Sequence, residues 1–354
     1  MYKYGIVGGK FRLLHLAHRE YFIQAMGEVE KLYIVVTNGH FERYATIFET
    51  QQAIGKIMMH MGFKVGEDYE IKIAPYTENQ DVWEDWLIEN LKVENAEDWV
   101  IFNSKEDYPN KKFQNKYLKL FSVDNIDKIS ATALEENPYT LVNSNFICQE
   151  FLTYMNKKVV ISGTESCGKT VLASKLAGVF DTEFSEEYGR YHAHYFLGDQ
   201  DLTFQPKDLV HVAMQQLLQD KEKNEKAKRL LVVDTDPIVT LRFFYEYNAR
   251  LKSLGLWSDY LEEEAERAEN QLIDFVENYK YDLILLLSPN VEFYNDGIRW
   301  DIDNARRWEN HEQLKALYRK YDIDFMEITA DNYNERFIEA VRIIRENLLV
   351  SKQT

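Results

Sequence analysis

The chain has 354 residues, of which 45% are hydrophobic and 29% charged, and its formal net charge is -17. This length favours two domains, and the acidic balance argues against non-specific binding of nucleic acid or anionic membranes. Two cysteines are too few for a disulfide framework, and no apolar run approaches the about 18–20 residues of a membrane span. We therefore expect a soluble, cytoplasmic, globular protein.

The first half of the chain alternates strand-like and helical patterns. Apolar runs predict strands at residues 4–7, 32–37, 69–74 and 99–102. Helical periodicity occurs at residues 21–26, 46–62 and 82–91. This alternation is typical of a doubly wound parallel sheet, which binds ligands at the carboxyl ends of its strands.

The turn after the first predicted strand carries two histidines. His15 and His18 are three residues apart at the start of a helix, so they project on neighbouring positions of one face. Beside a glycine turn and a helix N-terminus, they can donate hydrogen bonds to the phosphates of a nucleotide. A structural or solvated histidine pair explains the same spacing.

A second informative turn lies near residue 130. Ser130 is a good N-cap, and a carboxylate at Glu135 or Glu136 suits the first turns of the helix that follows. A plain capped helix explains this stretch by itself.

The second half opens on a phosphate-binding loop. Residues 163–170 read G-x-x-x-x-G-K-T, with an apolar run before them and an amphipathic helix after them. Gly163 and Gly168 let the backbone curl, so that successive N–H groups, including that of Ser166, point at phosphate oxygens. We expect Lys169 to reach the β- and γ-phosphates and Thr170 to hold Mg²⁺.

A buried run at residues 230–233 ends in two acids, Asp234 and Asp236. An Asp at a strand end beside such a loop is expected to bind Mg²⁺, and we place this role at Asp234. Asp236 is a candidate to orient the substrate or to accept a hydroxyl proton, and the sequence does not separate the two roles. Residues 281–288 and 325–328 predict further strands, and 333–348 a closing helix.

Taken together, these motifs resemble the NadR family, in which nicotinamide mononucleotide adenylyltransferase is fused to ribosylnicotinamide kinase. Residues 9–18 are similar to the G-x-F-x-P-x-H-x-G-H motif of nucleotidylyltransferases, and residues 129–132 to their I-S-x-T-x-x-R signature. Residues 187–190 resemble the family's E-Y-G-R segment, and residues 295–299 its D-D-G-x-R lid. The resemblance spans nearly the whole chain.

The resemblance implies an α/β protein of two doubly wound domains: a nucleotidylyltransferase at residues 1–156 and a P-loop nucleoside kinase at residues 157–354. The kinase would phosphorylate nicotinamide riboside with MgATP, and the first half would adenylylate the mononucleotide to NAD with release of pyrophosphate. The implied partners are small molecules, namely nicotinamide riboside, nicotinamide mononucleotide, ATP and NAD, with Mg²⁺ as cofactor and ATP as co-substrate. Nucleic acid and membranes are not expected as partners, and we expect this form to lack the family's repressor helix-turn-helix segment. The family suggests a homo-oligomer.

The resemblance also implies roles for single residues. In the first half, the implied catalytic residues are His15 and His18. The implied phosphate-binding residues are Gly9, Lys10, Phe11, Ser130 and Thr132, and Trp83 and Trp86 would stack on the nicotinamide ring. In the second half, the implied catalytic residues are Lys169, Asp234, Asp236, Glu187 and Arg299. The phosphate loop and Arg306 would bind ATP, and Tyr188, Arg190 and Trp257 would bind the substrate. Core packing explains the first two tryptophans equally well.

Three positions depart from the family's patterns. Leu13 stands where the family has Pro, Ala17 where it has Gly, and Glu135 where it has Arg. Glu135 brings negative charge beside a triphosphate, which is unfavourable unless a nearby cation such as Arg12, Arg19 or Lys128 compensates. These departures leave open an alternative, a kinase whose first half only binds nucleotide as a regulatory module.

Overall fold

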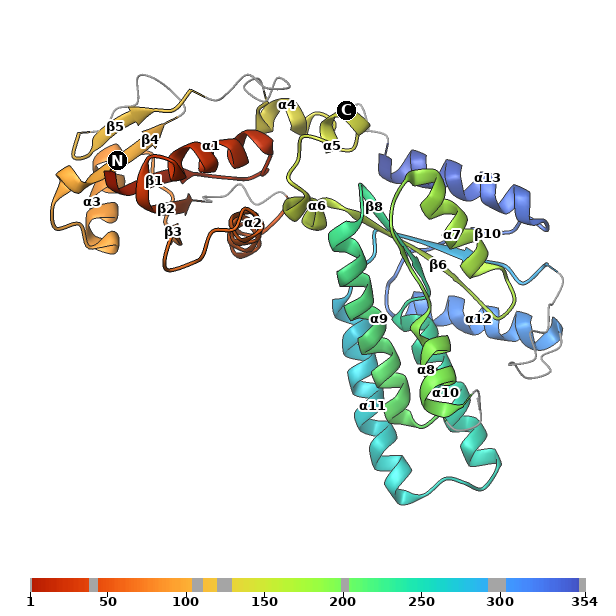
Figure 1. Ribbon diagram of the computed structural model, residues 1–354. Coiled ribbons are helices and arrows are strands. Elements are labelled where there is room, and N and C mark those ends of the chain that lie inside the picture. The colour runs from red at the N-terminus through yellow and green to blue at the C-terminus, as the bar shows by residue number, and fades with distance from the viewer. Residues whose placement is uncertain are drawn as a thin grey trace. The chain divides into compact units, whose positions relative to one another are not determined.

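The computed structural model describes residues 2–37, 44–103, 111–119, 129–198, 204–291 and 304–349. The chain folds into two compact units, Met1–Met155 and Asn156–Thr354 (Figure 1). Each unit is built around one five-stranded sheet whose neighbouring strands are all parallel. Two doubly wound α/β units were predicted from the sequence, and this fold class is confirmed.

The first sheet has the strand order β3-β2-β1-β4-β5. Its strands are β1 (Tyr2–Gly9), β2 (Val29–Thr37), β3 (Tyr69–Ala74), β4 (Trp99–Asn103) and β5 (Gln114–Tyr117). The order reverses between β1 and β4, so the topological switch point lies at the carboxyl end of β1. The predicted histidine turn leaves the sheet at this point.

Helices cover both faces of the first sheet. They are α1 (Leu16–Met26), α2 (Ile47–His60), α3 (Gln80–Leu91), η1 (Ala96–Asp98), α4 (Ala131–Glu135), α5 (Leu141–Ser144) and α6 (Gln149–Met155). Ile34 and Phe102 belong to the core under α1, α2 and α6, whereas Val35 and Ile101 pack with Leu87 of α3. Because both faces are buried, the central strands read as continuous apolar runs.

The second sheet has the strand order β10-β9-β6-β8-β7. Its strands are β6 (Lys157–Gly163), β7 (Phe184–Ser185), β8 (Leu230–Asp234), β9 (Leu283–Leu287) and β10 (Met326–Ile328). β6 is central, so the loop that follows it opens between the carboxyl ends of β8 and β9. The predicted phosphate loop therefore occupies the place where ligands bind in such sheets.

The second sheet is also covered on both faces. Its helices are α7 (Lys169–Phe180), α8 (Tyr188–Leu197), α9 (Pro206–Lys226), α10 (Pro237–Ser253), α11 (Asp259–Asn278), α12 (Asn304–Lys320), α13 (Tyr333–Ile344) and η4 (Arg345–Leu349). Val159 and Ile161 pack with α7 and α13, and Val160 with α9, α10 and α11. In Figure 1, α8 to α11 run beside one another, in agreement with their mutual contacts.

All strands and helices predicted from apolar patterns are present, with ends shifted by a few residues. β5 and β7 were not predicted. Both are edge strands, and an edge strand that faces solvent needs no continuous apolar run: β5 is Gln-Asn-Lys-Tyr, and β7 has only two residues.

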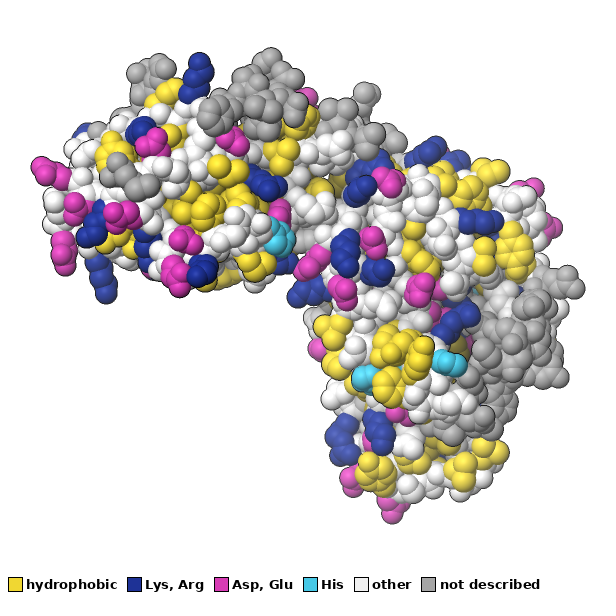
Figure 2. Space-filling model, viewed as in Figure 1, with side chains coloured by type: hydrophobic (Ala, Val, Ile, Leu, Met, Phe, Trp, Pro, Cys, Tyr) yellow, Lys and Arg dark blue, Asp and Glu magenta, His cyan; other side chains and the backbone are white. Residues whose placement is uncertain are grey.

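The described surface is highly charged. On the face shown in Figure 2, Lys and Arg side chains are interspersed with Asp and Glu over both units. The acidic run at residues 262–269 forms a largely exposed face of α11, as the sequence predicts. Among the residues that the structure describes, no helix is both long and apolar enough to cross a bilayer.

Candidate functional site

The loop between β6 and α7 has the backbone geometry that its glycines predict. Gly163, Ser166 and Gly168 have φ angles of 149°, 53° and 82°. A Cβ added to Gly168 would lie 2.5 Å from a ring carbon of Tyr333, and its positive φ is one that favours glycine. Lys169 begins α7, and its Nζ donates to the loop carbonyl of residue 164 at 3.0 Å. The result is an anion-binding turn backed by a helix N-terminus.

Thr170 and Asp234 meet beside this loop. Thr170 Oγ1 donates to Asp234 Oδ2 at 2.5 Å, and Asp234 Oδ1 is buried without a partner among the described residues. Burial, followed by the charge of Glu187, raises the pKa of Asp234 to about 6, although Lys169 opposes this shift. A hydroxyl beside an unpartnered carboxylate oxygen fits Mg²⁺, which takes oxygen ligands. The described part of the chain contains no group of three or more His, Cys, Asp or Glu side chains that could hold a metal ion.

Asp236, the other predicted acid, is engaged within the fold. Its Oδ1 caps α10 by accepting the Val239 N–H at 3.1 Å, and its Oδ2 accepts the Tyr318 hydroxyl at 2.7 Å. Burial raises the pKa of Asp236 to about 6, although these hydrogen bonds oppose the shift. Since both of its oxygens have partners, the geometry favours Asp234 as the cation ligand.

Three arginines, each at most 2% exposed, hold the outer side of the phosphate loop. Arg307 donates to the carbonyl oxygens of residues 165 and 166 at 3.3 and 3.4 Å, and Arg336 donates to that of residue 167 at 2.9 Å. Arg242 pairs with the Glu165 carboxylate at 2.7 Å. These contacts were not predicted from the sequence, because the partners lie between 77 and 169 residues apart.

The start of α8 also belongs to this site. The Glu187 carboxylate pairs with Arg190 Nε at 3.1 Å. Both charges act on Asp234: Glu187 raises its pKa and Arg190 lowers it. Ser185 of β7 is paired with Val233 of β8, so the predicted segment at residues 187–190 begins next to Asp234. Tyr188 lies in the first turn of α8, with its ring centre 5.3 Å from that of Tyr191.

The predicted ATP-binding Arg306 is linked to the loop by a network of ion pairs. Arg306 pairs with Glu309 at 2.9 Å and with Glu246 at 3.6 Å. Glu246 in turn pairs at 2.7 Å with Arg242, which holds the loop. Arg299, predicted to close on the phosphates, lies outside the described residues.

Trp257 is not brought to the phosphate loop. It lines a cavity of about 420 Å³ together with residues of α10 and α11. Its indole N–H donates to Glu262, and Lys252 Nζ lies 4.4 Å from the ring centre. Asn248 on the cavity wall is 12 residues beyond Asp236, or about 18 Å along α10 at 1.5 Å per residue.

In the first unit, the turn after β1 stacks the two predicted histidines. His15 is the N-cap of α1, and its ring centre lies 3.9 Å from that of His18. His18 Nδ1 accepts the backbone N–H of His15 at 3.4 Å. The histidine pair therefore lies at the switch point of the sheet.

Gly9, Lys10 and Phe11 form the bend that leads to these histidines. Phe11 has φ 45°, in the left-handed region, and its ring would lie 2.9 Å from a Cβ on Gly9. Lys10 Nζ lies over the ring of Tyr76, 4.7 Å from its centre. A non-glycine residue held at positive φ is the kind of strained position that clusters at ligand sites.

We expect both imidazoles to be neutral at physiological pH. Burial lowers the pKa of His15 to about 4, and burial together with the charge of His15 lowers the pKa of His18 well below its usual value. In nucleotide-free protein, the ring C–H resonances of His15 should not titrate in NMR spectra between roughly pH 6 and 8. Because protonation favours the unfolded chain, His15 should lower the stability of this unit progressively as the pH falls from 6.5 to about 4. A His15 midpoint near 6.5 would contradict the burial argument.

The region near residue 130 packs against the histidine turn through Arg12. Ser130 caps α4 by accepting the N–H of residue 133 at 3.2 Å. Arg12 donates to Thr132 Oγ1 at 3.3 Å and pairs with Glu135 at 3.1 Å. Of the three cations predicted to compensate Glu135, Arg12 is therefore confirmed, and Lys128 lies outside the described residues. The other departures, Leu13 and Ala17, are buried.

Trp83 and Trp86 lie near the same edge of the first sheet as the histidine turn. Their rings are nearly parallel, at 6°, with centres 6.1 Å apart. Trp83 packs directly on β1, since a Cβ added to Gly8 would lie 2.9 Å from its ring. Both side chains are partly buried against the core under α3, so they combine a packing role with exposed ring surface.

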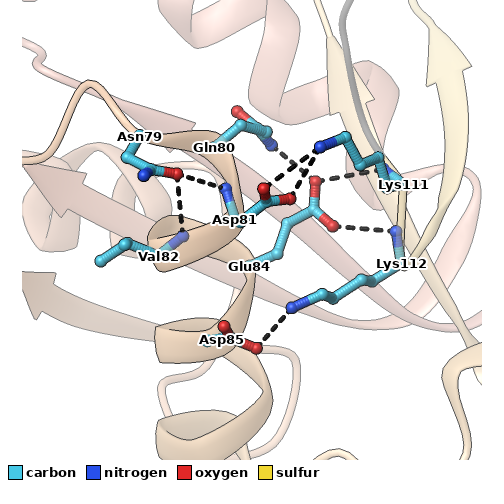
Figure 3. Close-up of polar contacts among 8 residues, drawn as sticks. All are labelled: Asn79, Gln80, Asp81, Val82, Glu84, Asp85, Lys111 and Lys112. Carbon is cyan, nitrogen blue, oxygen red and sulfur yellow. Dashed lines mark hydrogen bonds and ion pairs between the residues drawn. The ribbon is translucent and has the colours of Figure 1, made fainter.

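A fully buried carboxylate, Glu84, fixes the helix that carries these tryptophans (Figure 3). It accepts the backbone N–H groups of Lys111 and Lys112 at 3.1 and 2.8 Å and the Gln80 amide at 2.9 Å. The Lys111 ammonium also pairs with Asp81 at 2.9 Å. These bonds tie α3 to the segment before β5. The role of Glu84 was not predicted from the sequence, because Glu84 is one of several acidic residues on this helix.

Comparisons with known proteins agree with this architecture. A family model described as an AAA domain matches residues 158–336, half of the chain. The trifunctional NAD biosynthesis/regulator protein NadR of Escherichia coli (strain K12) is 24% identical over 358 residues, which cover 97% of this chain and 82% of that protein. The protein of the same name from Salmonella typhimurium (strain LT2) is also 24% identical, with the same coverage.

Two solved structures of NadR share the fold. A NadR protein in complex with NAD and AMP-PNP has a TM-score of 0.75 at 20% identity, covering 100% of this chain and 98% of that chain. A NadR protein in complex with NR has a TM-score of 0.74 at 19% identity, covering 99% and 98%. The chain belongs to the AAA domain family over residues 158–336, and over nearly its whole length it is similar to NadR proteins.

Proposed function

We propose that the chain is a bifunctional enzyme of NAD biosynthesis. The second unit would phosphorylate nicotinamide riboside with MgATP, and the first unit would adenylylate the resulting mononucleotide to NAD. The observation that carries the kinase assignment is the meeting of Thr170, Asp234 and Glu187 at one phosphate loop. The NAD biosynthesis name of the two bacterial relatives supports the substrate class.

In the kinase step, the protein positions reactants and stabilises charge. The loop N–H groups and Lys169 would bind the β- and γ-phosphates, and Thr170 and Asp234 would hold Mg²⁺, which offsets phosphate charge when bound. Glu187 would accept a hydrogen bond, and then the proton, from the 5′-hydroxyl of the riboside as its oxygen attacks the γ-phosphorus. Arg190, paired with Glu187, would bind the ribose or the transferred phosphate.

In the adenylyltransferase step, the 5′-phosphate of the mononucleotide would attack the α-phosphorus of ATP in line and release pyrophosphate. Neutral His15 and His18 would donate hydrogen bonds to the ATP phosphates, and Ser130 and Thr132 would bind the distal phosphates. Trp83 and Trp86 would stack on the cationic nicotinamide ring. Of the departures from the family's patterns, the negative charge of Glu135 disfavours this activity most. Arg12 pairs with Glu135 at 3.1 Å and offsets this charge.

A second candidate is a kinase whose first unit only binds nucleotide as a regulatory module. Buried Leu13 and Ala17, at positions where the family has Pro and Gly, favour this alternative. The two candidates differ in their products. Purified protein incubated with nicotinamide riboside and MgATP should yield NAD through the mononucleotide; mononucleotide without NAD would support the second candidate, and absence of both products would refute both.

A further inference from the structure

A buried polar cluster lies under the turn that carries Glu187, and none of the motifs includes it. Ser185 and Asp220 are 0% exposed and Gln216 is 4% exposed, with Gln219 half-buried beside them. Three of the four side chains come from one helix, α9, and Ser185 ends β7. Buried polar groups at this density need a reason, because each must be fully hydrogen-bonded.

The cluster holds the chain on both sides of Glu187. Gln219 Nε2 donates to the carbonyl oxygen of Glu186 at 2.7 Å, and Gln216 Oε1 accepts the backbone N–H of Tyr188 at 2.8 Å. The backbone groups immediately before and after the carboxylate are thus bound by two side chains three residues apart on α9. These two hydrogen bonds therefore fix the backbone position of Glu187.

Asp220 orients the side-chain amide of Gln216, which binds the Tyr188 N–H. It accepts the Gln216 amide N–H at 2.9 Å, the Ser185 hydroxyl at 2.5 Å and the Tyr281 hydroxyl at 3.1 Å. A carboxylate only accepts, so the Gln216 NH₂ group must face Asp220 and its carbonyl oxygen must face Tyr188. Asp220 therefore orients Gln216 for the turn.

We propose that Gln216 and Gln219, with Asp220 behind them, are positioning residues that fix the Glu187 carboxylate beside Asp234, where it can accept the proton of the acceptor hydroxyl as that oxygen attacks the γ-phosphorus. A network that only stabilised the fold would not need its bonds to converge on the two backbone groups flanking Glu187. This inference rests on the proposed kinase function. It adds that α9, which supplies none of the residues of the motifs, controls the acceptor side of the reaction.

The test compares Gln219→Met with Gln215→Met. Methionine keeps the length of the side chain and removes both donors, and Gln215 is a similarly half-buried glutamine of α9 with no hydrogen bond to this turn in the described structure. For riboside phosphorylation, Gln219→Met should lower kcat at least about tenfold, with the KM for ATP and the melting temperature unchanged. Gln215→Met should stay within about twofold of wild type. An unchanged kcat in Gln219→Met, or a fall that merely follows a loss of folded protein, would overturn the proposal.

A double-mutant cycle separates positioning from general weakening. In a Glu187→Asp background the carboxylate is already displaced, so adding Gln219→Met should change kcat by less than about twofold. Equal effects in both backgrounds would show that Gln219 does not act through Glu187. Wild-type protein without riboside kinase activity would refute the proposed function itself, whereas an active wild type with an unaffected Gln219→Met would refute only the positioning role.

Discussion

In the proposed reactions, Lys169→Met should slow the phosphorylation of nicotinamide riboside by at least about a hundredfold while the conversion of mononucleotide to NAD continues. Lys169 lies in the curl of the phosphate loop, where its ammonium is the cation placed to reach the β- and γ-phosphates. Loss of one such preorganised contact in a water-poor site lowers kcat by about 10² to 10³-fold. Chromatography of the products with riboside and with mononucleotide as separate substrates measures both steps.

Lys175→Met is the matched control for this variant. Lys175 lies on the same helix, α7, but is exposed to solvent. Its substitution should leave both reactions within about twofold of wild type. Riboside phosphorylation that persists in Lys169→Met would refute the assignment of the loop, and a loss of NAD formation from mononucleotide would show that the first unit does not act through its own site.

Glu165→Gln should destabilise the second unit by about 3 kcal/mol. Glu165 and Arg242 form a buried ion pair at 2.7 Å, with side chains 7% and 2% exposed, and removal of one charge leaves the other desolvated. We place the effect at the low end of the expected range because Glu246 remains 2.7 Å from Arg242. Hydrogen exchange of the β6 and α7 amides in urea reports the stability of this unit alone.

The pH dependence of this variant provides a second test. Although burial alone would raise it, the charge of Arg242 brings the pKa of Glu165 below its usual 4.5. A depressed folded-state pKa stabilises the protein above the unfolded-state pKa, and this contribution is lost as the pH falls through the folded-state pKa. The difference between wild type and Glu165→Gln should therefore shrink in acid. Glu263→Gln, which removes an exposed pair with Arg267 at 3.8 Å, should change stability by less than about 1 kcal/mol at neutral pH.

The sequence predicts the parts of the site whose signals are local. The phosphate loop, the acids after β8 and the histidine turn each combine a strand end with residues a few positions away. These short stretches determine their own backbone geometry, so pattern and spacing identify them.

The parts that the sequence did not predict depend on contacts between distant segments. Arg336 binds a loop carbonyl from 169 residues away, and Glu84 binds backbone groups 27 and 28 residues further along the chain. A lone arginine or glutamate on a helix reads as a solvated charge until tertiary structure buries it. Glu135 is intermediate: the need for a compensating cation was predictable, but the structure was required to show that Arg12 supplies one.

The arginines behind the phosphate loop have a consequence for nucleotide binding. Arg307 and Arg336 bind the carbonyl oxygens of residues 165 to 167 at 3.3, 3.4 and 2.9 Å. In a trans peptide the N–H points opposite to the C=O, so the N–H groups of residues 166 to 168 are turned away from these arginines and toward the phosphate side. The loop is therefore ordered before ATP arrives. Binding then loses little loop entropy, and association should proceed without a slow rearrangement of this segment.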